Sequence, residues 1–406
     1  MDFDDASDEA AFRADVRAWL AQNAEPKRHA RDFIGDGLPP AERLAASRAW
    51  QANKAAAGYA AVTWPREFGG LGGTVVQQLI YRQEECRYRS SFGYFEIGLG
   101  MCLPTLLAYA SSEHKARYVR PGLYGQEIWC QMFSEPGAGS DVAGLTTRAV
   151  RDGDEWVIDG QKVWTSAAHY AAFGMCVTRS DASLPKHQGL SMFIVPVDTA
   201  GIEVRPLVLM TGDHAFNEVF FTGVRIPAAN IVGDLNGGWR CALSMLMNER
   251  VALGASGNSL VSGRADVLIH AARNAGVNHD LVLRQELADV YILEEVLRHV
   301  GLRVRAALES GRAPGPEGSI AKLIGSKLVT KAASVGMTIA GPRGAARMVD
   351  DEDSHNVTKG FLHAPSMSIA GGTSEIQRNI MGERVLGLPK DPDPFRSAAF
   401  ADIPKN

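Results

Sequence analysis

Residues 133–141 of this chain read Phe133-Ser134-Glu135-Pro136-Gly137-Ala138-Gly139-Ser140-Asp141. The two glycines let a backbone approach a ligand closely, and exposed N–H groups in such a loop can hold an anion. Two serines add hydroxyl groups to the same loop. Taken alone, the stretch is as typical of an ordinary turn as of a binding loop. The segments around it are needed to distinguish these two interpretations.

The stretch lies in a region of short β-branched and aromatic runs separated by turn residues, a pattern typical of strands. These runs cover 128–133, 146–151, 155–165, 173–178, 190–196, 202–209 and 217–224. Inside the third run, Asp159-Gly160 stands between Trp156-Val157-Ile158 and Gln161 to Trp164, and Asp-Gly favours a hairpin turn because it tolerates positive φ. So many short strands in about 110 residues predict a sandwich or barrel.

Helical periodicity appears on both sides of this region. Near the start, Phe12, Val16, Trp19 and Leu20 recur at helical spacing and predict one buried helix face. Thr74 is placed to cap the helix that follows it. After residue 236, helical patterns over 239–275, 280–309, 318–340 and 373–386 predict a helical bundle.

We therefore expect an α+β fold made of three domains. An N-terminal helical domain covers 1–125, a middle antiparallel β domain covers 126–235, and a C-terminal helical bundle covers 236–390. The tail over 391–406 is rich in Pro and Asp, so we expect it to be loosely held.

Composition excludes several classes of function. The 406 residues carry a formal net charge of −4, so we expect no binding to nucleic acid or to anionic membranes. The five cysteines show no metal-binding or Cys-x-x-Cys spacing and read as reduced thiols: Cys86, Cys102, Cys130, Cys176 and Cys241. The acidic start lacks a signal core, and no apolar run approaches the roughly 20 residues that cross a bilayer. These features predict a cytoplasmic protein.

A glycine cluster, Gly69-Gly70-Leu71-Gly72-Gly73, suggests a phosphate loop at first reading. The dinucleotide fingerprint requires a preceding strand, and none is predicted before this cluster. We interpret it as a flexible turn before a helix.

Three further motifs point to a family. They are Glu113 to Tyr118, Trp164-Thr165-Ser166, and Gly371-Gly372-Thr373-Ser374-Glu375-Ile376-Gln377-Arg378 near the C-terminus. Together with the 133–141 stretch and the domain order, they resemble the acyl-CoA dehydrogenase family from residue 5 to residue 388. The Ser-Glu-Pro-Gly-Ala-Gly-Ser-Asp motif is highly specific for that family, and the C-terminal motif is an independent match.

The resemblance implies an oxidoreductase that carries FAD and acts on an acyl-CoA thioester. It implies that 131–140 line the flavin and its phosphates, that Trp164 covers one face of the flavin ring, and that Ser166 lies near its reactive nitrogen. The expected FAD contacts are Gln131, Met132, Phe133, Ser134, Gly139, Ser140, Trp164, Thr165, Ser166, Thr373 and Glu375. A neighbouring subunit is expected to add Arg273, Arg284, Gln285 and Gly341, in a homodimer, a homotetramer or a hetero-oligomer.

The chain departs from the family at the catalytic base. Many members carry a Glu directly before the Gly-Thr of the C-terminal motif, and here that position is Gly371. Other members place the Glu on the first helix after the β domain, before an Arg, and Glu249-Arg250 match that arrangement. A carboxylate among apolar neighbours is costly unless it has a function, although a surface Glu or an ion pair with Arg250 is the plain alternative. We expect Glu249 to be the base and Arg250 to hold a CoA oxygen.

Gly371 keeps its backbone N–H, which can donate to the thioester carbonyl oxygen. One such donor contributes about 3–4 kcal/mol when it meets a developing oxyanion. Ser140 and Gly372 are further expected substrate contacts. At 273–276, only Arg273 remains of the family's Arg-x-Thr-Phe element, so flavin contacts across subunits are expected to be weaker or different.

The resulting hypothesis is a concerted α,β-dehydrogenation to the trans-2-enoyl-CoA. Hydrogen bonds to the carbonyl acidify the α-proton, Glu249 removes it, and the β-hydrogen leaves with its electron pair to FAD. An electron-transferring flavoprotein is the expected electron acceptor. Two alternatives stay open: a non-catalytic or half-equipped subunit of a mixed complex, and a flavin oxidase or monooxygenase on the same fold.

Small residues near the expected pocket favour a branched or ring-bearing acyl group. They are Ala252, Gly254, Ala255, Gly257, Ala370 and Gly371. Close packing of helices explains the same residues equally well.

Overall fold

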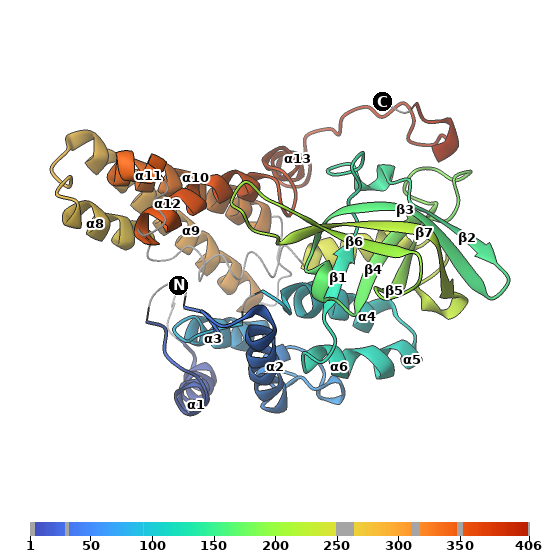
Figure 1. Ribbon diagram of the computed structural model, residues 1–406, viewed down its shortest axis with the longest axis horizontal. Coiled ribbons are helices and arrows are strands. Elements are labelled where there is room, and N and C mark those ends of the chain that lie inside the picture. Colours follow the sequence, from blue (N-terminus) through green and yellow to red (C-terminus); the bar gives the residue numbers. More distant parts are fainter. Residues whose placement is uncertain are drawn as a thin grey trace. The chain divides into compact units, whose positions relative to one another are not determined.

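A computed structural model describes residues 5–28, 32–91, 93–248, 264–309, 317–346 and 352–404. The chain divides into two compact units, one made of residues 9–249 and 391–406, the other of residues 250–390 with the first eight residues. The α+β fold is confirmed, because helices, strands and helices follow one another along the chain (Figure 1).

Helices precede the sheet in the first unit. They are α1 (Ser7–Asn23), α2 (Pro40–Ala56), α3 (Val75–Glu85), α4 (Leu103–Tyr109), α5 (Ser112–His114) and α6 (Arg120–Leu123). In α1, Val16 and Leu20 are fully buried, as their spacing predicted. Thr74 caps α3 as expected, because its hydroxyl accepts from the N–H of Gln77 while the Gln77 side chain accepts from the N–H of Thr74.

The strands form one sheet in the order β6-β7-β3-β2-β4-β5-β8, with β1 beside β4. They are β1 (Trp129–Met132), β2 (Arg148–Asp152), β3 (Glu155–Ser166), β4 (Phe173–Arg179), β5 (Leu190–Pro196), β6 (Ile202–Leu207), β7 (Phe216–Pro227) and β8 (Ile231–Val232). The expectation of an antiparallel domain is wrong for two pairs, because both β1 and β2 run parallel to β4. Strand β8 was not expected, since two residues leave no sequence pattern.

The hairpin turn expected at Asp159-Gly160 is wrong. Strand β3 runs without a turn from Glu155 to Ser166, and its hairpin with β2 turns at Gly153, whose φ is 59°. Gly160 has a φ of 147° at a register shift between β3 and β7, so it marks a β-bulge. The Asp159 carboxylate accepts from the N–H of Gly223 and ties the bulge to β7.

Strands β4 and β5 are buried on both faces. All seven residues of β5 except Pro196 are buried, which explains its continuous apolar run. Phe193 joins the cluster inside the β domain. Met192 faces the other way and packs in one cluster with Leu106 of α4 and Met245 of the helical segment 238–248. Figure 1 shows α4 beside these strands.

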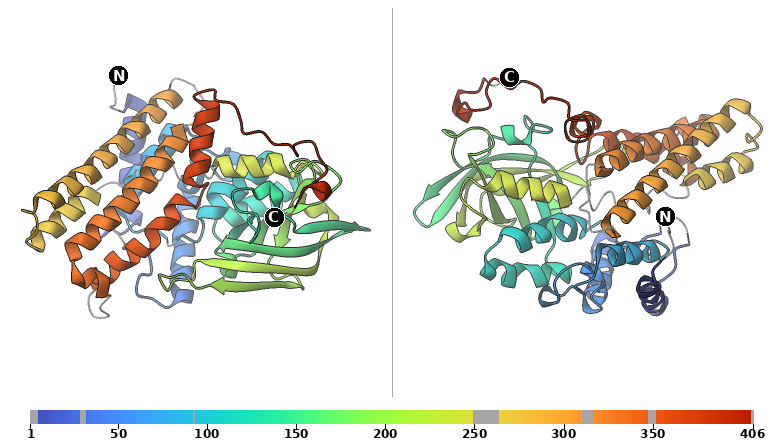
Figure 2. Two further views of the ribbon diagram at one scale, coloured as in Figure 1. Left: turned by 90° about the horizontal axis from the view of Figure 1, so that it is seen from above. Right: turned by 180° about the vertical axis from the view of Figure 1, so that it is seen from behind.

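The second unit is a helical bundle, as expected. Its helices are α8 (Arg264–Asn274), α9 (Leu281–Glu309), α10 (Glu317–Ala340), α11 (Pro342–Ala346), α12 (Glu352–His363) and α13 (Ser374–Arg384). Figure 2 shows α9 and α10 side by side, and Val290 and Leu297 of α9 share a core with Leu328 and Val335 of α10.

The end of the C-terminal tail is not loosely held. The N–H of Phe400 donates to the carbonyl of Leu184 and the N–H of Ala401 to that of Ala182, both at 2.9 Å. The guanidinium carbon of Arg179 lies 3.8 Å from the centroid of the Phe400 ring. Composition could not indicate this docking, because backbone groups and a single aromatic ring make it.

We expect Gly160→Ala to destabilise the protein more than Gly153→Ala. A Cβ at 160 would lie 2.7 Å from the Cα of Thr147, whereas a Cβ at 153 meets nothing within 4 Å. Both variants carry a strain of about 1–3 kcal/mol from positive φ. The clash at 160 should add about 1–3 kcal/mol. Urea unfolding measures the difference, and equal losses would contradict the bulge.

Candidate functional site

The 133–141 loop leaves β1 and turns back on itself. Glu135 and Ala138 exchange backbone hydrogen bonds of 3.0 Å in both directions, which closes a tight turn. The Glu135 residue is only 6% exposed. The exposed members of the loop are Pro136, Gly137, Gly139, Ser140 and Asp141. The turn therefore offers backbone and small side chains to solvent while it buries one carboxylate.

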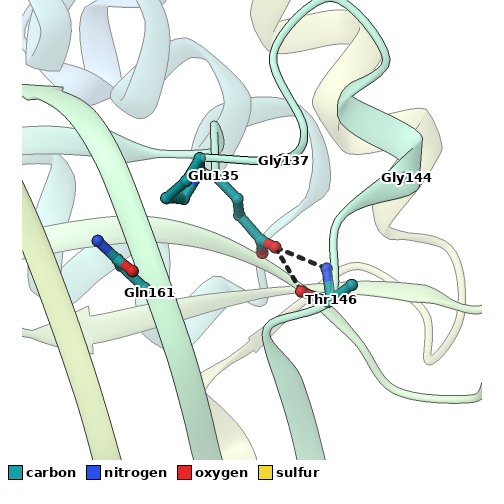
Figure 3. Close-up of a pocket in the computed structure, with 6 residues that line it drawn as sticks. Glu135, Gly137, Gly144, Thr146 and Gln161 are labelled. Carbon is teal, nitrogen blue, oxygen red and sulfur yellow. Dashed lines mark hydrogen bonds between the residues drawn. The ribbon is translucent and has the colours of Figure 1, made fainter. Parts of the chain in front are cut away.

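That carboxylate ties the loop to the start of β2 (Figure 3). Its Oε2 accepts from the N–H and the hydroxyl of Thr146 at 2.7 and 2.8 Å. Its Oε1 accepts from the N–H of Thr147 at 2.9 Å. Both oxygens of Glu135 are thus bound, as a buried carboxylate requires.

Lys162 supplies the charge that balances Glu135. Its side chain is fully buried, and its Nζ donates to Glu135 Oε1 and to the carbonyl oxygen of Phe133, both at 2.9 Å. The next residue, Val163, donates its N–H to the carbonyl of Ser134 at 2.9 Å. We call this the Glu135–Lys162 clamp. It holds the 133–141 loop against the strand that carries Trp164-Thr165-Ser166, so two of the predicted motifs lie together.

The clamp keeps Glu135 ionised. Burial alone would raise the pKa of Glu135, but the Lys162 charge and the hydrogen bonds from Thr147 and Thr146 outweigh burial and lower the pKa to about 2. Glu135 therefore serves as an anchor and not as a proton donor. Burial raises the pKa of the neighbouring Cys176 thiol to about 11, partly offset by Lys162, so that thiol is inert.

Trp164 has an unusual backbone and an exposed ring. Its φ is 58°, and the residue is 58% exposed. The conformation coincides with a register shift between Lys162 and Thr165 in the pairing of β3 with β7. The ring meets Phe216 edge-on, with centroids 5.9 Å apart. An exposed indole in a costly left-handed conformation fits a flat ring system laid against its face, as the expected flavin would be.

Asn217 fixes the strand directly after the indole. It is fully buried, its Nδ2 donates to the carbonyl of Thr165 at 2.9 Å, and its Oδ1 lies 3.1 Å from Nδ1 of His169. The buried hydroxyl of Thr165 has no hydrogen-bond partner among the described residues. Ser166 is half-buried and ends β3.

The predicted flavin contacts in this unit divide into two groups. The side chains of Met132, Phe133 and Thr165 are buried, so mainly backbone atoms remain there for a ligand. The accessible residues are Gln131, Ser134, Gly139, Ser140, Trp164 and Ser166. A binding surface built on this strand and loop would therefore consist largely of backbone, hydroxyls and one indole.

A cavity of about 250 Å³ opens beside the clamp (Figure 3). It is lined by Glu135, Pro136, Gly137, Gly144, Thr146 and Gln161. The Gln161 side chain donates to Glu218 at 2.8 Å. Sites for whole drug-sized ligands measure about 300–1,000 Å³, so this cavity is large enough only for part of a dinucleotide.

The C-terminal motif forms a turn and a capped helix in the other unit. The hydroxyl of Thr373 accepts from the N–H of Ile376 at 3.2 Å and caps α13. Gly371 and Gly372 have φ angles of 68° and 92°. The position that carries the catalytic Glu in many family members thus adopts a conformation that side chains rarely take, so a carboxylate there would be strained.

The other predicted residues of this unit lie on its surface. Arg273 stands in the last turn of α8, Arg284 and Gln285 in the first turns of α9, and Gly341 after α10, and all four are exposed. Glu375 is exposed in α13 and pairs with Arg378 at 3.1 Å. These positions are accessible to another chain.

Glu249 and Arg250 lie outside the described residues. The helical segment 238–248 leads to them, with Met245 fully buried and Met247 54% exposed. The roles given to Glu249 and Arg250 therefore stay predictions.

Two buried polar residues were missed from the sequence, Lys162 and Gln377. A signal for Lys162 exists, because it shares the inward parity of β3 with Trp156 and Ile158 and follows a motif that contains a Glu. Gln377 lies in the C-terminal motif but was not given a role.

Within the described ranges, no helix is long and apolar enough to cross a membrane. The same residues contain no group of three His, Cys, Asp or Glu side chains suited to hold a metal ion.

Known proteins resemble this chain along nearly its whole length. Profiles of the acyl-CoA dehydrogenase N-terminal, middle and C-terminal domains match residues 6–126, 130–224 and 236–386. Acyl-CoA dehydrogenase IpdE1 of Mycobacterium tuberculosis is 34% identical over 382 residues, which cover 94% of this chain and 98% of the relative. Acyl-CoA dehydrogenase FadE34 of the same organism is 37% identical over 333 residues, which cover 82% of this chain and 45% of the relative.

Two solved structures share the fold. The ChsE4-ChsE5 complex from Mycobacterium tuberculosis matches with a TM-score of 0.78 at 30% identity, covering 96% of this chain and 100% of that one. The Tcur3481-Tcur3483 steroid ACAD matches with a TM-score of 0.79 at 28% identity and the same coverage.

We expect Lys162→Met to destabilise the protein by about 3–5 kcal/mol, because it leaves a buried carboxylate without its counter-charge. The double variant with Glu135→Gln should recover most of the loss, since the neutral amide needs no partner charge. Urea unfolding measures both. Lys390→Met, which removes a largely exposed partner of Glu383, is the control and should cost less than about 1 kcal/mol. Similar losses for the Lys162 and Lys390 variants would count against the clamp.

We expect ionised Glu135 to contribute to the free energy of unfolding, and we expect this contribution to be lost in acid. Its folded pKa of about 2 lies below the ordinary value of 4.5, so its stabilising contribution is complete above pH 4.5 and is lost as pH falls towards 2. The contribution is on the order of 3 kcal/mol. Thermal unfolding across this range should show a steeper loss in the wild type than in Glu135→Gln, and parallel curves would refute the assigned pKa.

Proposed function

Because the chain belongs to the acyl-CoA dehydrogenase family of oxidoreductases and FAD is its cofactor, we propose that it oxidises the Cα–Cβ bond of an acyl-CoA thioester to the trans-2-enoyl-CoA. The observation that carries the proposal is the strained, exposed Trp164 beside the exposed backbone of the 133–141 loop. A flat ring and a phosphate-bearing tail need those two surfaces together.

The residues of this site fit FAD. In the proposal, the Trp164 indole covers one face of the flavin ring and Ser166 lies at its edge. The N–H groups of Gly137, Gly139 and Ser140 meet its phosphates. Gly137 and Gly139 have open space where a Cβ would stand, so a ligand can approach their backbone. Bound FAD supplies the redox chemistry, since it accepts the β-hydrogen with its electron pair.

Glu249 is the base in this proposal. Gly371 has no side chain, and its φ of 68° disfavours one, so the carboxylate must come from another element. Glu249 removes the α-proton while the backbone N–H of Gly371 donates to the thioester carbonyl oxygen. Arg250 holds an oxygen of CoA, and Ser140 lies near the thioester end.

The proposed acyl group is bulky and ring-bearing. Ala370 and the two glycines after it leave room beside the thioester, and the segment 252–257 is also rich in small residues. A solved relative at 28% identity is described as a steroid ACAD. Electrons would then pass to an electron-transferring flavoprotein, as the family resemblance implies.

A second candidate function is that of one subunit in a mixed complex. Two solved relatives are named as pairs of different proteins, ChsE4-ChsE5 and Tcur3481-Tcur3483. Two departures from the family favour the same idea. Gly371 lacks the carboxylate that many members carry there, and only Arg273 remains of the element that contacts flavin across subunits. Mass photometry and FAD content of the chain expressed alone distinguish the two: a stable flavin-loaded homo-oligomer speaks for self-sufficiency, and a flavin-free chain for an obligate partner.

Glu249→Gln should keep its FAD but lose catalysis. Flavin reduction by a ring-bearing acyl-CoA, followed anaerobically by rapid mixing, should be slower by about 10²–10⁴-fold, because a general base contributes that much. Glu42→Gln, an exposed change on α2, should reduce its flavin like the wild type. A wild-type rate in Glu249→Gln would show that the base is another residue.

A further inference from the structure

Gln377 is a fully buried polar side chain on α13 that grips the preceding turn. Its Nε2 donates to the carbonyl of Gly371 at 3.0 Å and to that of Gly372 at 3.3 Å. Its Oε1 is buried and has no hydrogen-bond partner in the described part of the chain. This buried amide donates both of its hydrogens to carbonyl groups of one turn. It therefore fixes the turn, in addition to the Thr373 cap that already begins the helix.

The hydrogen bonds from Gln377 determine the direction in which the N–H groups of the turn point. In a planar trans peptide the carbonyl and the N–H face opposite ways. Because Gln377 holds the carbonyl of Gly371, the N–H of Gly372 in the same peptide faces away from Gln377. Neither the Gly371 nor the Gly372 N–H has a hydrogen-bond partner among the residues that the structure describes. Both are therefore available to an acceptor.

The glycines make this approach feasible. Gly372 has a φ of 92°, and a Cβ there would lie 2.7 Å from the Nε2 of Gln377. A side chain at 372 would therefore push the amide away. The turn also opens the N-terminus of α13, where the helix dipole favours negative charge.

We propose that Gln377 is a positioning residue that aims the N–H of Gly372 at the thioester carbonyl oxygen of the substrate. This inference rests on the proposed function. It adds the N–H of Gly372 as a second donor beside the N–H of Gly371, and it names Gln377 as the residue that orients this second donor. Gln377 does not touch the substrate. It acts by holding the peptide between Gly371 and Gly372 in one orientation while charge develops on the oxygen.

Gln377→Met removes both donor hydrogens at nearly constant volume. Anaerobic flavin reduction should slow by about 10–100-fold, part of the effect of losing an oxyanion donor. FAD content and the dissociation constant for acyl-CoA should change less than about twofold, because the lost interaction strengthens only in the transition state. Asn379→Met, on the exposed part of the same helix, should match the wild type. A wild-type rate in Gln377→Met overturns the proposal.

Infrared spectroscopy tests the hydrogen bond directly. A CoA thioester with sulfur at the β position has no β-hydrogen to transfer, and in the Glu249→Gln background its α-proton also stays in place, so its bound carbonyl stretch reports the hydrogen-bond donors. In that background the stretch should shift to lower frequency, and the shift should shrink when Gln377→Met or Gly372→Ala is added. An unchanged shift in both variants overturns the proposal even if their rates fall.

Gln377→Glu adds a test that a purely structural role would fail. A carboxyl group facing two carbonyls can donate only when protonated. The ratio of the variant rate to the wild-type rate should therefore rise as pH falls, and a ratio independent of pH counts against positioning.

The failure of this inference can be distinguished from the failure of the proposed function. If no acyl-CoA reduces the wild-type flavin, the proposed function fails and this inference with it. If the wild type is reduced and Gln377→Met behaves normally, only this inference fails.

Discussion

The buried ion pair between Glu135 and Lys162 is the constraint on which the site in the β domain depends. Desolvation makes such a pair costly, and the bonds to Thr146, Thr147 and the Phe133 carbonyl offset that cost. The same bonds set the position of the 133–141 loop against β3. With Lys162 held before it and Asn217 holding the Thr165 carbonyl after it, Trp164 can stay exposed in a left-handed conformation. A buried ion pair thus supports the accessible surface that we propose for FAD.

The C-terminal turn follows a similar logic, with a buried amide in place of an ion pair. Gln377 holds the carbonyls of Gly371 and Gly372, and among the residues that the structure describes no group accepts from their N–H groups. This shape requires positive φ at both glycines, which disfavours the carboxylate that many relatives carry at this place. The proposed relocation of the base to Glu249 is therefore a consequence of how the turn is built. The turn supplies donors, and another element supplies the base.

The sequence predicted features that leave a local pattern. The α1 face of Val16 and Leu20, the Thr74 cap and most strands were correct because period and capping chemistry are local. The hairpin turn predicted at Asp159-Gly160 was wrong, because a dipeptide that favours a turn also suits a β-bulge. Only the pairing of β3 with β7 distinguishes the two. Lys162, Gln377 and the docking of Phe400 depend on partners distant along the chain or on backbone atoms. The motifs expected to contact FAD were identified through their resemblance to a family, whereas only the structure shows the groups that hold them in place.

An anaerobic titration of the purified wild-type chain, expressed alone, with straight, branched and ring-bearing acyl-CoAs shows directly whether the chain is a dehydrogenase, when flavin absorbance is recorded. We expect a chain that carries FAD and whose flavin bleaches with a ring-bearing acyl-CoA. Flavin that no acyl-CoA bleaches, or a chain that holds no flavin, would contradict a self-sufficient dehydrogenase.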